Sequence, residues 1–270
     1  EVPAPTPGPG EVIVATAYSV VSSGTEVAAI RTQSSGVLGK ALTRPGQVKK
    51  LAEKAVKEGI VVAQQSVSDW LARWRPIGYS LSGIITEVGS EVSGLRVGDR
   101  VACSGAEYAH HAEQVAVPFR LAVPIPDSVG LKDAAFAPVS AIAMQAIRRS
   151  KVSIGETVSV IGLGLIGLLC CQILQRVGCR VVGYDPDTKR CETALALGCK
   201  VAVGDEETLE SEIRELTASL GTDSVIVCAG TSSDEPVNLS MRIVRDRGRI
   251  VVVGDVGMDI DRGQMYRKEL

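Results

Sequence analysis

The pattern of apolar and polar positions changes once along the chain. The first part contains short β-branched or alternating runs separated by Gly and Pro, at 11–17, 83–88, 100–103 and 112–117. Such runs are typical of a small antiparallel β domain. After Pro126, an Ala-rich segment with helical spacing, 132–150, leads into strands that alternate with helices. The sequence therefore predicts two domains, 1–123 and 124–270.

The alternation in the second domain predicts a doubly wound parallel sheet. The expected strands are 157–161, 180–184, 200–203, 224–228 and 249–253, and the expected helices are 165–176, 188–197, 209–220 and 235–244. A helix-length segment separates each pair of successive strands, and parallel strands require such a crossover. The fold class is therefore α/β, with an antiparallel β domain in front of it.

Residues 31–76 fit neither domain. Basic residues outnumber acidic ones there, and apolar positions recur at helical spacing, which predicts amphipathic helices inserted into the β domain. The insert is either a solvated basic face or a lid or surface for an acidic ligand. Both tryptophans of the chain, Trp70 and Trp74, lie on one predicted face, where they either pack in a core or stack on a substrate.

The composition excludes several classes of protein. A formal net charge of −2 at pH 7 provides no general basic field for nucleic acid or for an anionic membrane. The longest mainly apolar stretch, 158–174, is interrupted by glycines and is too short for a transmembrane helix, and the Pro/Gly-rich start is unlike a signal sequence. The seven cysteines form no CxxC or CxxH pattern, which favours reduced thiols in the cytoplasm over disulfides or a zinc finger.

A glycine-rich motif marks the expected cofactor site. The residues 162–167 have the pattern GxGxxG. The motif directly follows an apolar strand and begins a helix, which is the context that this pattern requires. Gly162 permits a tight turn, Gly164 lets the backbone approach a pyrophosphate, and Gly167 allows close packing of helix on strand. A plain tight turn is the alternative interpretation. The candidate residues here are Gly162, Leu163, Gly164, Leu165, Ile166 and Gly167.

Asp185 ends the second strand of the α/β domain and is the expected selector of the cofactor. It lies about 20 residues beyond the motif, where a carboxylate binds the ribose hydroxyls and repels a 2′-phosphate. NAD(H) is therefore favoured over NADP(H), although the basic side chains of Lys189 and Arg190, just downstream, are able to bind the 2′-phosphate of NADP(H). The remaining candidate cofactor residues are Arg190 itself, Ala229, Gly230, Val253 and Gly254.

The order of motifs resembles the medium-chain dehydrogenase/reductase superfamily, the alcohol dehydrogenase-like enzymes. The motifs that carry the resemblance are PIGYSLSG at 76–83, EVG at 87–89, VGDRV at 97–101 and AEQV at 112–115, ahead of the nucleotide fold. The similarity is closest to bacterial bi-domain oxidoreductases, in which Gly-Tyr-Ser replaces the usual motif. The resemblance implies a GroES-like β-barrel substrate domain, a Rossmann domain and a cleft between them.

The resemblance also shows where the zinc ligands of the family are missing. Ser23 stands where zinc-dependent members have Cys, Gly78-Tyr79-Ser80 replaces Gly-His-Glu, and the third ligand position falls near Val139. Ser, Tyr and Val do not replace a thiolate and imidazole set around Zn²⁺. We therefore expect a zinc-free protein with no metal site.

Three residues are the candidate catalytic groups that the resemblance implies. Thr25 stands at the position of the hydroxyl that hydrogen-bonds the reacting substrate oxygen. Tyr79 either presents its phenol to a substrate carbonyl or fills the vacated metal volume. Glu26 is either a salt-bridge partner or a general acid/base. Of the histidines His110 and His111, at most one faces the cleft, because neighbours on an extended segment point to opposite sides.

The sequence as a whole predicts a zinc-independent, NAD(H)-dependent oxidoreductase that acts on a secondary alcohol or ketone of a small, sugar-like or biosynthetic substrate. An enone C=C reductase and a non-catalytic NAD-binding or partner-docking module are the alternatives. The family pattern continues beyond Leu270 into a further strand and a return to the substrate domain, so we expect a fragment or parts supplied elsewhere. A homodimer or a fused or partner oxidoreductase domain is the expected assembly.

Overall fold

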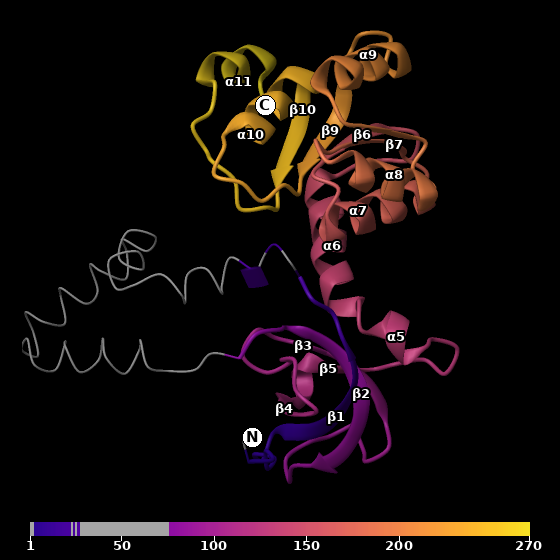
Figure 1. Ribbon diagram of the computed structural model, residues 1–270, viewed down its shortest axis with the longest axis vertical. Helices are drawn as coiled ribbons and strands as arrows, with labels where there is room; N and C mark the ends of the chain where they lie inside the picture. The colour runs from indigo at the N-terminus through magenta and orange to yellow at the C-terminus, as the bar shows by residue number, and fades with distance from the viewer. Residues whose placement is uncertain (1–2, 23, 25, 28–75) are drawn as a thin grey trace, which may run out of the picture. The chain divides into compact units, whose positions relative to one another are not determined.

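The chain divides into two compact units, Glu1–Pro138 and Val139–Leu270 (Figure 1). The computed structural model describes residues 3–22, 24, 26–27 and 76–270, so Ser23, Thr25 and nearly all of the 31–76 insert with both tryptophans lie outside the described residues. The domain boundary suggested by the sequence, between 123 and 124, falls inside strand β5 (Ala122–Pro124). Helix α5 (Leu131–Ala134) follows β5 and contacts strands of the first unit, which therefore extends beyond that boundary.

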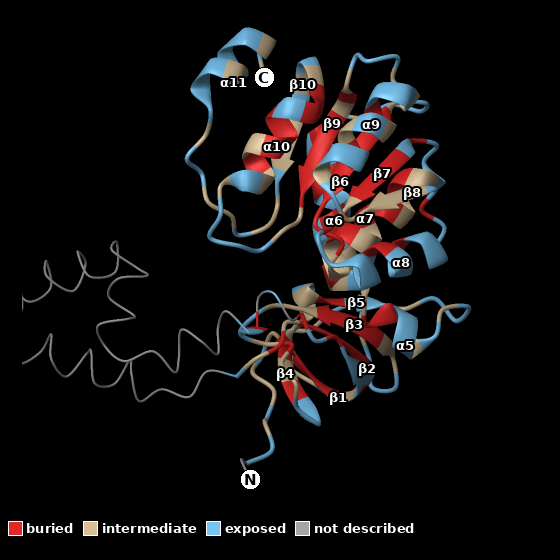
Figure 2. Cartoon of the chain, turned by 45° about the horizontal axis from the view of Figure 1, so that its top comes forward, coloured by how far each residue is buried: buried red, intermediate tan, exposed pale blue. Residues whose placement is uncertain are grey.

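The first unit is a five-stranded antiparallel sheet with strand order β4-β1-β2-β3-β5. Its other strands are β1 (Glu11–Ser19), β2 (Ser80–Val88), β3 (Arg100–Ser104) and β4 (Gln114–Pro118), and a 3₁₀ turn, η1 (Phe119–Leu121), precedes β5. Buried side chains of β1 to β4 form one apolar core, which includes Val12, Val14, Leu81, Ile85, Val101 and Val117. Figure 2 colours the buried parts of these strands red. The sequence located four of these strands, whereas β5, with three residues, is too short to show an alternating pattern.

Two serines of β2 attach helix α5 to the sheet. The Ser80 hydroxyl donates to the Ala135 carbonyl at 2.7 Å, and the Ser82 hydroxyl donates to the Leu131 carbonyl. Both serines are fully buried, at 0% exposure. A buried polar side chain keeps its place only when it is hydrogen-bonded, so these two contacts fix the connection that leads into the second unit.

The Ser80→Ala variant is expected to lower the free energy of unfolding by about 1–2 kcal/mol, because it leaves the Ala135 carbonyl without its hydroxyl donor. Urea denaturation followed by circular dichroism measures the change. Ser90 lies exposed in the turn after β2, so Ser90→Ala is the matched control and should change stability by less than about 0.5 kcal/mol. Equal losses in the two variants would contradict a specific role for the Ser80 contact.

The second unit is a doubly wound α/β fold around a five-stranded parallel sheet with order β10-β9-β6-β7-β8. The strands are β6 (Thr157–Ile161), β7 (Arg180–Tyr184), β8 (Val201–Val203), β9 (Thr222–Val227) and β10 (Val244–Val252). The helices are α6 (Ala137–Ser150), α7 (Leu165–Arg176), α8 (Thr188–Ala196), α9 (Glu206–Leu216), α10 (Glu235–Ile243) and α11 (Arg262–Lys268). From β6 the chain first adds β7 and β8 on one side of β6, and it later adds β9 and β10 on the other side. This reversal places a topological switch point at the carboxyl end of β6.

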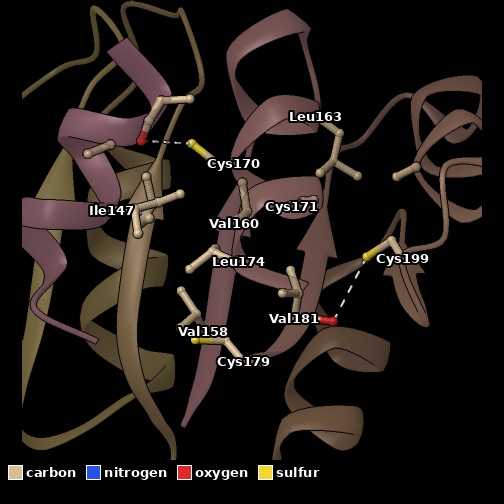
Figure 3. Close-up of a cluster of buried hydrophobic side chains, with 14 of the residues drawn as sticks. Ile147, Val158, Val160, Leu163, Cys170, Cys171, Leu174, Cys179, Val181 and Cys199 are labelled. Atoms are coloured by element: carbon tan, nitrogen blue, oxygen red, sulfur yellow. Dashed lines mark hydrogen bonds between the residues drawn. The ribbon is translucent and has the colours of Figure 1, made fainter. Parts of the chain in front are cut away.

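One apolar cluster covers each face of this sheet. The first includes buried residues of α6, α7 and α8, and the second includes buried residues of α9 and α10. The first cluster includes five buried cysteines, Cys170, Cys171, Cys179, Cys191 and Cys199. Figure 3 labels four of them, Cys170, Cys171, Cys179 and Cys199, among aliphatic side chains such as Val158, Val160, Leu174 and Val181. All seven cysteines of the chain are free thiols. They behave as small core residues, and burial raises the pKa of the Cys103 thiol to about 12.

The helical segment expected over 132–150 is two helices rather than one. Pro138 has no amide N–H to donate to the carbonyl of Ala134, so α5 ends and α6 begins at Ala137, with Pro138 in its first turn. Strand β10 starts at Val244, five residues before the predicted start at 249. The residues between Val244 and Arg249 are mostly polar and lie at a shift in the register with β9, so the sequence shows no strand pattern there. Helix α11 was not predicted, because it has no buried residue and so no apolar face.

In the part of the chain that the structure describes, every helix is too short or too polar to cross a membrane.

Candidate functional site

The turn between β6 and α7 requires glycine at its first position. Gly162 has φ of +92°, and a Cβ there would lie 2.5 Å from the backbone nitrogen of Ala229. The Gly162 amide donates to the carbonyl of Tyr184 at 2.8 Å, which holds the turn against the end of β7. A side chain at this position is therefore excluded both by the backbone conformation and by the neighbouring strand end.

The other two motif glycines have different surroundings. A Cβ on Gly167 would lie 1.9 Å from the Gly162 carbonyl oxygen, so α7 rests directly on the turn. A Cβ on Gly164 would meet nothing within 4 Å, so the space beside this residue is open. Gly164 caps α7 without a side-chain hydrogen bond, and the helix begins at Leu165 and Ile166, whose N–H groups belong to its first turn. This helix end has the geometry of an anion-binding site.

Asp185 follows β7 and is buried, with 3% of its surface exposed. Its Oδ2 accepts a hydrogen bond from the Leu163 amide at 2.8 Å and one from Arg190 Nη1 at 3.2 Å. Its Oδ1 accepts from the Asp187 amide at 2.9 Å. A carboxylate offers about four lone-pair directions, so one direction, at Oδ1, has no donor among the described residues. The sequence did not predict this bond between the carboxylate and the glycine turn.

The remaining cofactor candidates lie at the carboxyl ends of β9 and β10. The Val253 and Gly254 amides both donate to the Val227 carbonyl, at 2.8 and 3.1 Å. A Cβ on Gly254 would lie 1.8 Å from the Ala229 carbonyl oxygen, whereas one on Gly230 would meet nothing within 4 Å. Parallel strands end at one edge of the sheet, so the structure brings these residues to the same edge as the glycine turn and Asp185.

In the first unit, Glu26 is paired with a histidine. Glu26 is buried, at 5% exposure; its Oε1 accepts from the Ser22 amide at 2.9 Å, and its Oε2 lies 3.0 Å from His111 Nε2. The other ring nitrogen, Nδ1, lies 2.9 Å from Ser19 Oγ. Glu26 and His111 are 85 residues apart, so no local pattern in the sequence signals their pairing.

The remaining candidates of the first unit are Tyr79, Thr25 and His110, and the structure describes Tyr79 and His110. Tyr79 is half-buried just before β2, and its carbonyl accepts from the Gly105 amide at 3.0 Å. Thr25 lies outside the described residues. The Nδ1 of His110 is buried without a hydrogen-bond partner among the described residues, and burial, followed by the charge of His111, lowers the pKa of its imidazole.

No metal-binding cluster is present in the residues that the structure describes: they contain no group of three or more His, Cys, Asp or Glu side chains arranged to hold a metal ion. Of the three positions at which the family carries zinc ligands, Val139 is buried in α6, Tyr79 is half-buried, and Ser23 lies outside the described ranges. The absence of zinc remains a prediction from the residue types.

Two family matches cover most of the chain. Residues 24–127 match the alcohol dehydrogenase GroES-like domain, and residues 166–270 match the zinc-binding dehydrogenase family. Among curated proteins, the chain is 26% identical over 228 residues to D-arabitol-phosphate dehydrogenase from Enterococcus avium, covering 72% of this chain and 64% of that protein. It is 32% identical over 188 residues to quinone oxidoreductase-like protein 2 from Rattus norvegicus, covering 68% of this chain and 53% of that protein.

Solved structures share the fold. Galactitol-1-phosphate dehydrogenase from Escherichia coli superposes with a TM-score of 0.75 at 19% identity, covering 100% of this chain and 77% of that one. Alcohol dehydrogenase TADH from Thermus sp. ATN1 gives 0.76 at 18% identity, covering 100% and 78%. The chain spans less than two thirds of the length of these two curated relatives. With its GroES-like unit followed by a Rossmann-type unit, the chain belongs to the alcohol dehydrogenase-like medium-chain dehydrogenases/reductases.

Proposed function

We propose that this chain is the substrate and cofactor-binding part of a zinc-independent oxidoreductase that uses NAD(H). The observation that carries the proposal is the buried Asp185 carboxylate, which is hydrogen-bonded to the middle of the glycine turn and keeps one acceptor direction free. When bound, the nicotinamide supplies hydride transfer to or from a carbon atom that bears oxygen. The residues of the chain bind the cofactor and polarise that oxygen.

The glycine turn fits a pyrophosphate. The open space beside Gly164 and the uncapped start of α7 leave N–H groups and a positive helix dipole without a partner from a side chain. Gly162 to Gly167 would hold the phosphates, while Gly230 and Gly254 lie at the same sheet edge without bulky side chains. These features support a dinucleotide over a plain structural turn.

The charges around Asp185 support NAD(H) over NADP(H). Arg190 is already bound to Asp185 at 3.2 Å and to Asp187 at 3.7 Å, so the three side chains together keep a negative charge. A 2′-phosphate there would face the buried carboxylate and would need Arg190 to leave both partners. A ribose hydroxyl instead donates to the free direction at Oδ1.

The substrate that we propose is a small secondary alcohol or ketone. Thr25 and Tyr79 would polarise the reacting oxygen in place of a metal, and the similarity to D-arabitol-phosphate dehydrogenase supports a sugar-like molecule. Reduction of a conjugated C=C bond or quinone is the second candidate, because the chain is 32% identical to a quinone oxidoreductase-like protein.

NADH oxidation with a panel of sugar-derived ketones, simple ketones, enones and quinones tests the proposal. Turnover should persist after treatment with a chelator and without stoichiometric zinc in the sample. Tyr79→Phe should lower kcat by about 10²-fold if the phenol polarises the carbonyl, while Tyr108→Phe, a half-buried tyrosine of the same unit, serves as the control. Binding of NADH without turnover would favour the non-catalytic alternative, and activity restored only by Zn²⁺ would contradict zinc independence.

A further inference from the structure

Three side chains of the first unit form a hydrogen-bonded chain that leads from the protein interior to solvent. The carboxylate of Glu26 is the buried end, with 7% of its side chain exposed, and the imidazole of His111 is next, with 21% exposed. The hydroxyl of Ser19, at the exposed end of β1, is the outer end. The two links measure 3.0 Å and 2.9 Å. Such a linear arrangement is suited to moving a proton.

The chemistry of the partners fixes the roles of the two ring nitrogens. An ionised carboxylate only accepts hydrogen bonds, so a neutral His111 carries its proton on Nε2 and donates it to Glu26. Nδ1 is then an acceptor, and the Ser19 hydroxyl donates to it. A proton that arrives through Ser19 is therefore taken up at Nδ1, and the carboxylate of Glu26 stabilises the imidazolium that results.

The position of His111 is fixed by the segment that ends at Tyr79. Gly78 has φ of +104°, and a Cβ there would lie 2.9 Å from the His111 backbone nitrogen and 3.1 Å from its Cδ2. The His111 amide also donates to the Ile77 carbonyl at 3.0 Å. The imidazole thus packs on the backbone immediately before Tyr79, the residue that stands in place of a zinc ligand.

We propose that Ser19, His111 and Glu26 form the proton relay of the alcohol–ketone reaction, an inference that rests on the proposed function. Oxidation of a secondary alcohol breaks a C–H and an O–H bond and forms C=O. The nicotinamide, when bound, would accept the hydride with its electron pair. The hydroxyl proton passes to Ser19 Oγ, whose own proton moves to Nδ1 of His111. Reduction of the ketone runs the same transfers backwards, so atoms and charges balance in both directions.

The charged and titratable groups around the imidazole are consistent with this role. Glu26 faces Nε2 and is held in place by the Ser22 amide on its other oxygen. His110 is the adjacent titratable group, and burial, followed by the charge of His111, lowers the pKa of its imidazole. Glu26 is the positioning residue: its carboxylate holds the imidazole of His111, and His111 takes up the proton.

Nitrogen NMR on the ¹⁵N-labelled full chain tests the relay without requiring turnover. The chain has only two histidines, so His111→Gln identifies the His111 signals by their loss. The expected result is a neutral His111 with the proton on Nε2, and proton uptake at Nδ1 on acidification. In Glu26→Gln the preference for the Nε2–H form should weaken. A neutral His111 that carries its proton on Nδ1 would overturn the relay.

Kinetics on the same variants supply the second readout. His111→Gln keeps a donor for Glu26 but has no basic nitrogen, and it should lower kcat by about 10²-fold with little change in KM or NADH affinity. Added imidazole should restore part of the kcat lost in His111→Ala, which a merely structural role would not allow. His110→Gln is the matched control and should keep its kcat.

The two proposals fail in distinguishable ways. Turnover that is unchanged in His111→Gln overturns the relay and leaves the oxidoreductase intact. A chain that binds NADH but turns over no carbonyl compound of the panel overturns the oxidoreductase proposal and the relay with it. A kcat that falls equally in His110→Gln and His111→Gln, without rescue by imidazole, assigns His111 a structural role only and overturns the relay.

Discussion

The Gly167→Ala variant is expected to lose about 3 kcal/mol of unfolding free energy. Its new Cβ would lie 1.9 Å from the carbonyl oxygen of Gly162. The Cβ is fixed directly to the backbone of α7, the oxygen belongs to the backbone of Gly162, and Gly162 is itself confined by Ala229, so neither can move aside without separating α7 from β6. The gain of about 1 kcal/mol that Ala usually brings to a helix is too small to offset such overpacking.

Urea denaturation of the full chain measures this loss, and Gly164→Ala provides the matched control. A Cβ on Gly164 meets nothing within 4 Å, so its stability should change by less than about 0.5 kcal/mol. The same methyl group occupies the space that we assign to the pyrophosphate, so NADH binding should weaken in this variant. If Gly167→Ala were as stable as the wild type, the close packing of α7 on the turn would be refuted.

The Asp185→Asn variant is expected to bind NADH about 10²-fold more weakly. Both carboxylate oxygens accept backbone N–H groups, from Leu163 and Asp187, but an amide offers only one oxygen. One of the two N–H groups would therefore face an NH₂ group, which costs about 1–3 kcal/mol and displaces the glycine turn. The loss of charge also removes the repulsion of a 2′-phosphate, so the preference for NADH over NADPH should narrow.

Fluorescence titration with both cofactors checks this result, and Asp187→Asn is the control. Asp187 is the N-cap of α8, where its Oδ1 accepts from the Lys189 amide and its side chain is 50% exposed. Asn caps a helix about as well as Asp, so this variant should bind NADH nearly as the wild type does. Equal NADH affinity in Asp185→Asn and the wild type would show that Asp185 does not contact the cofactor.

The second unit could be predicted closely from the sequence, because its signals are local. Strands β6 (Thr157–Ile161) and β7 (Arg180–Tyr184) and helix α7 (Leu165–Arg176) were predicted with the same bounds, since each is an apolar or periodic run. The glycine spacing also predicted which positions tolerate no side chain. The tight surroundings of Gly167 match the close packing of helix on strand expected there, whereas the role of Gly164 at a pyrophosphate stays a prediction.

The contacts that connect distant parts of the chain could not be predicted in this way. The sequence singled out Asp185 and Glu26, but not their hydrogen bonds to Leu163 and His111, because these depend on tertiary packing. The arrangement corrects the expectation that Asp185 is free to accept from both ribose hydroxyls: three backbone or side-chain donors already occupy it. The NAD(H) preference and the absence of zinc stay predictions.

The most direct test of the account is a titration of NADH and NADPH against the unmodified chain, followed by cofactor fluorescence. Asp185 and the glycine turn predict saturable binding of NADH that is much tighter than that of NADPH. Tighter binding of NADPH would contradict Asp185 as the selector and would assign Arg190 to a phosphate. The failure of both cofactors to bind would contradict a nicotinamide site at the end of β6.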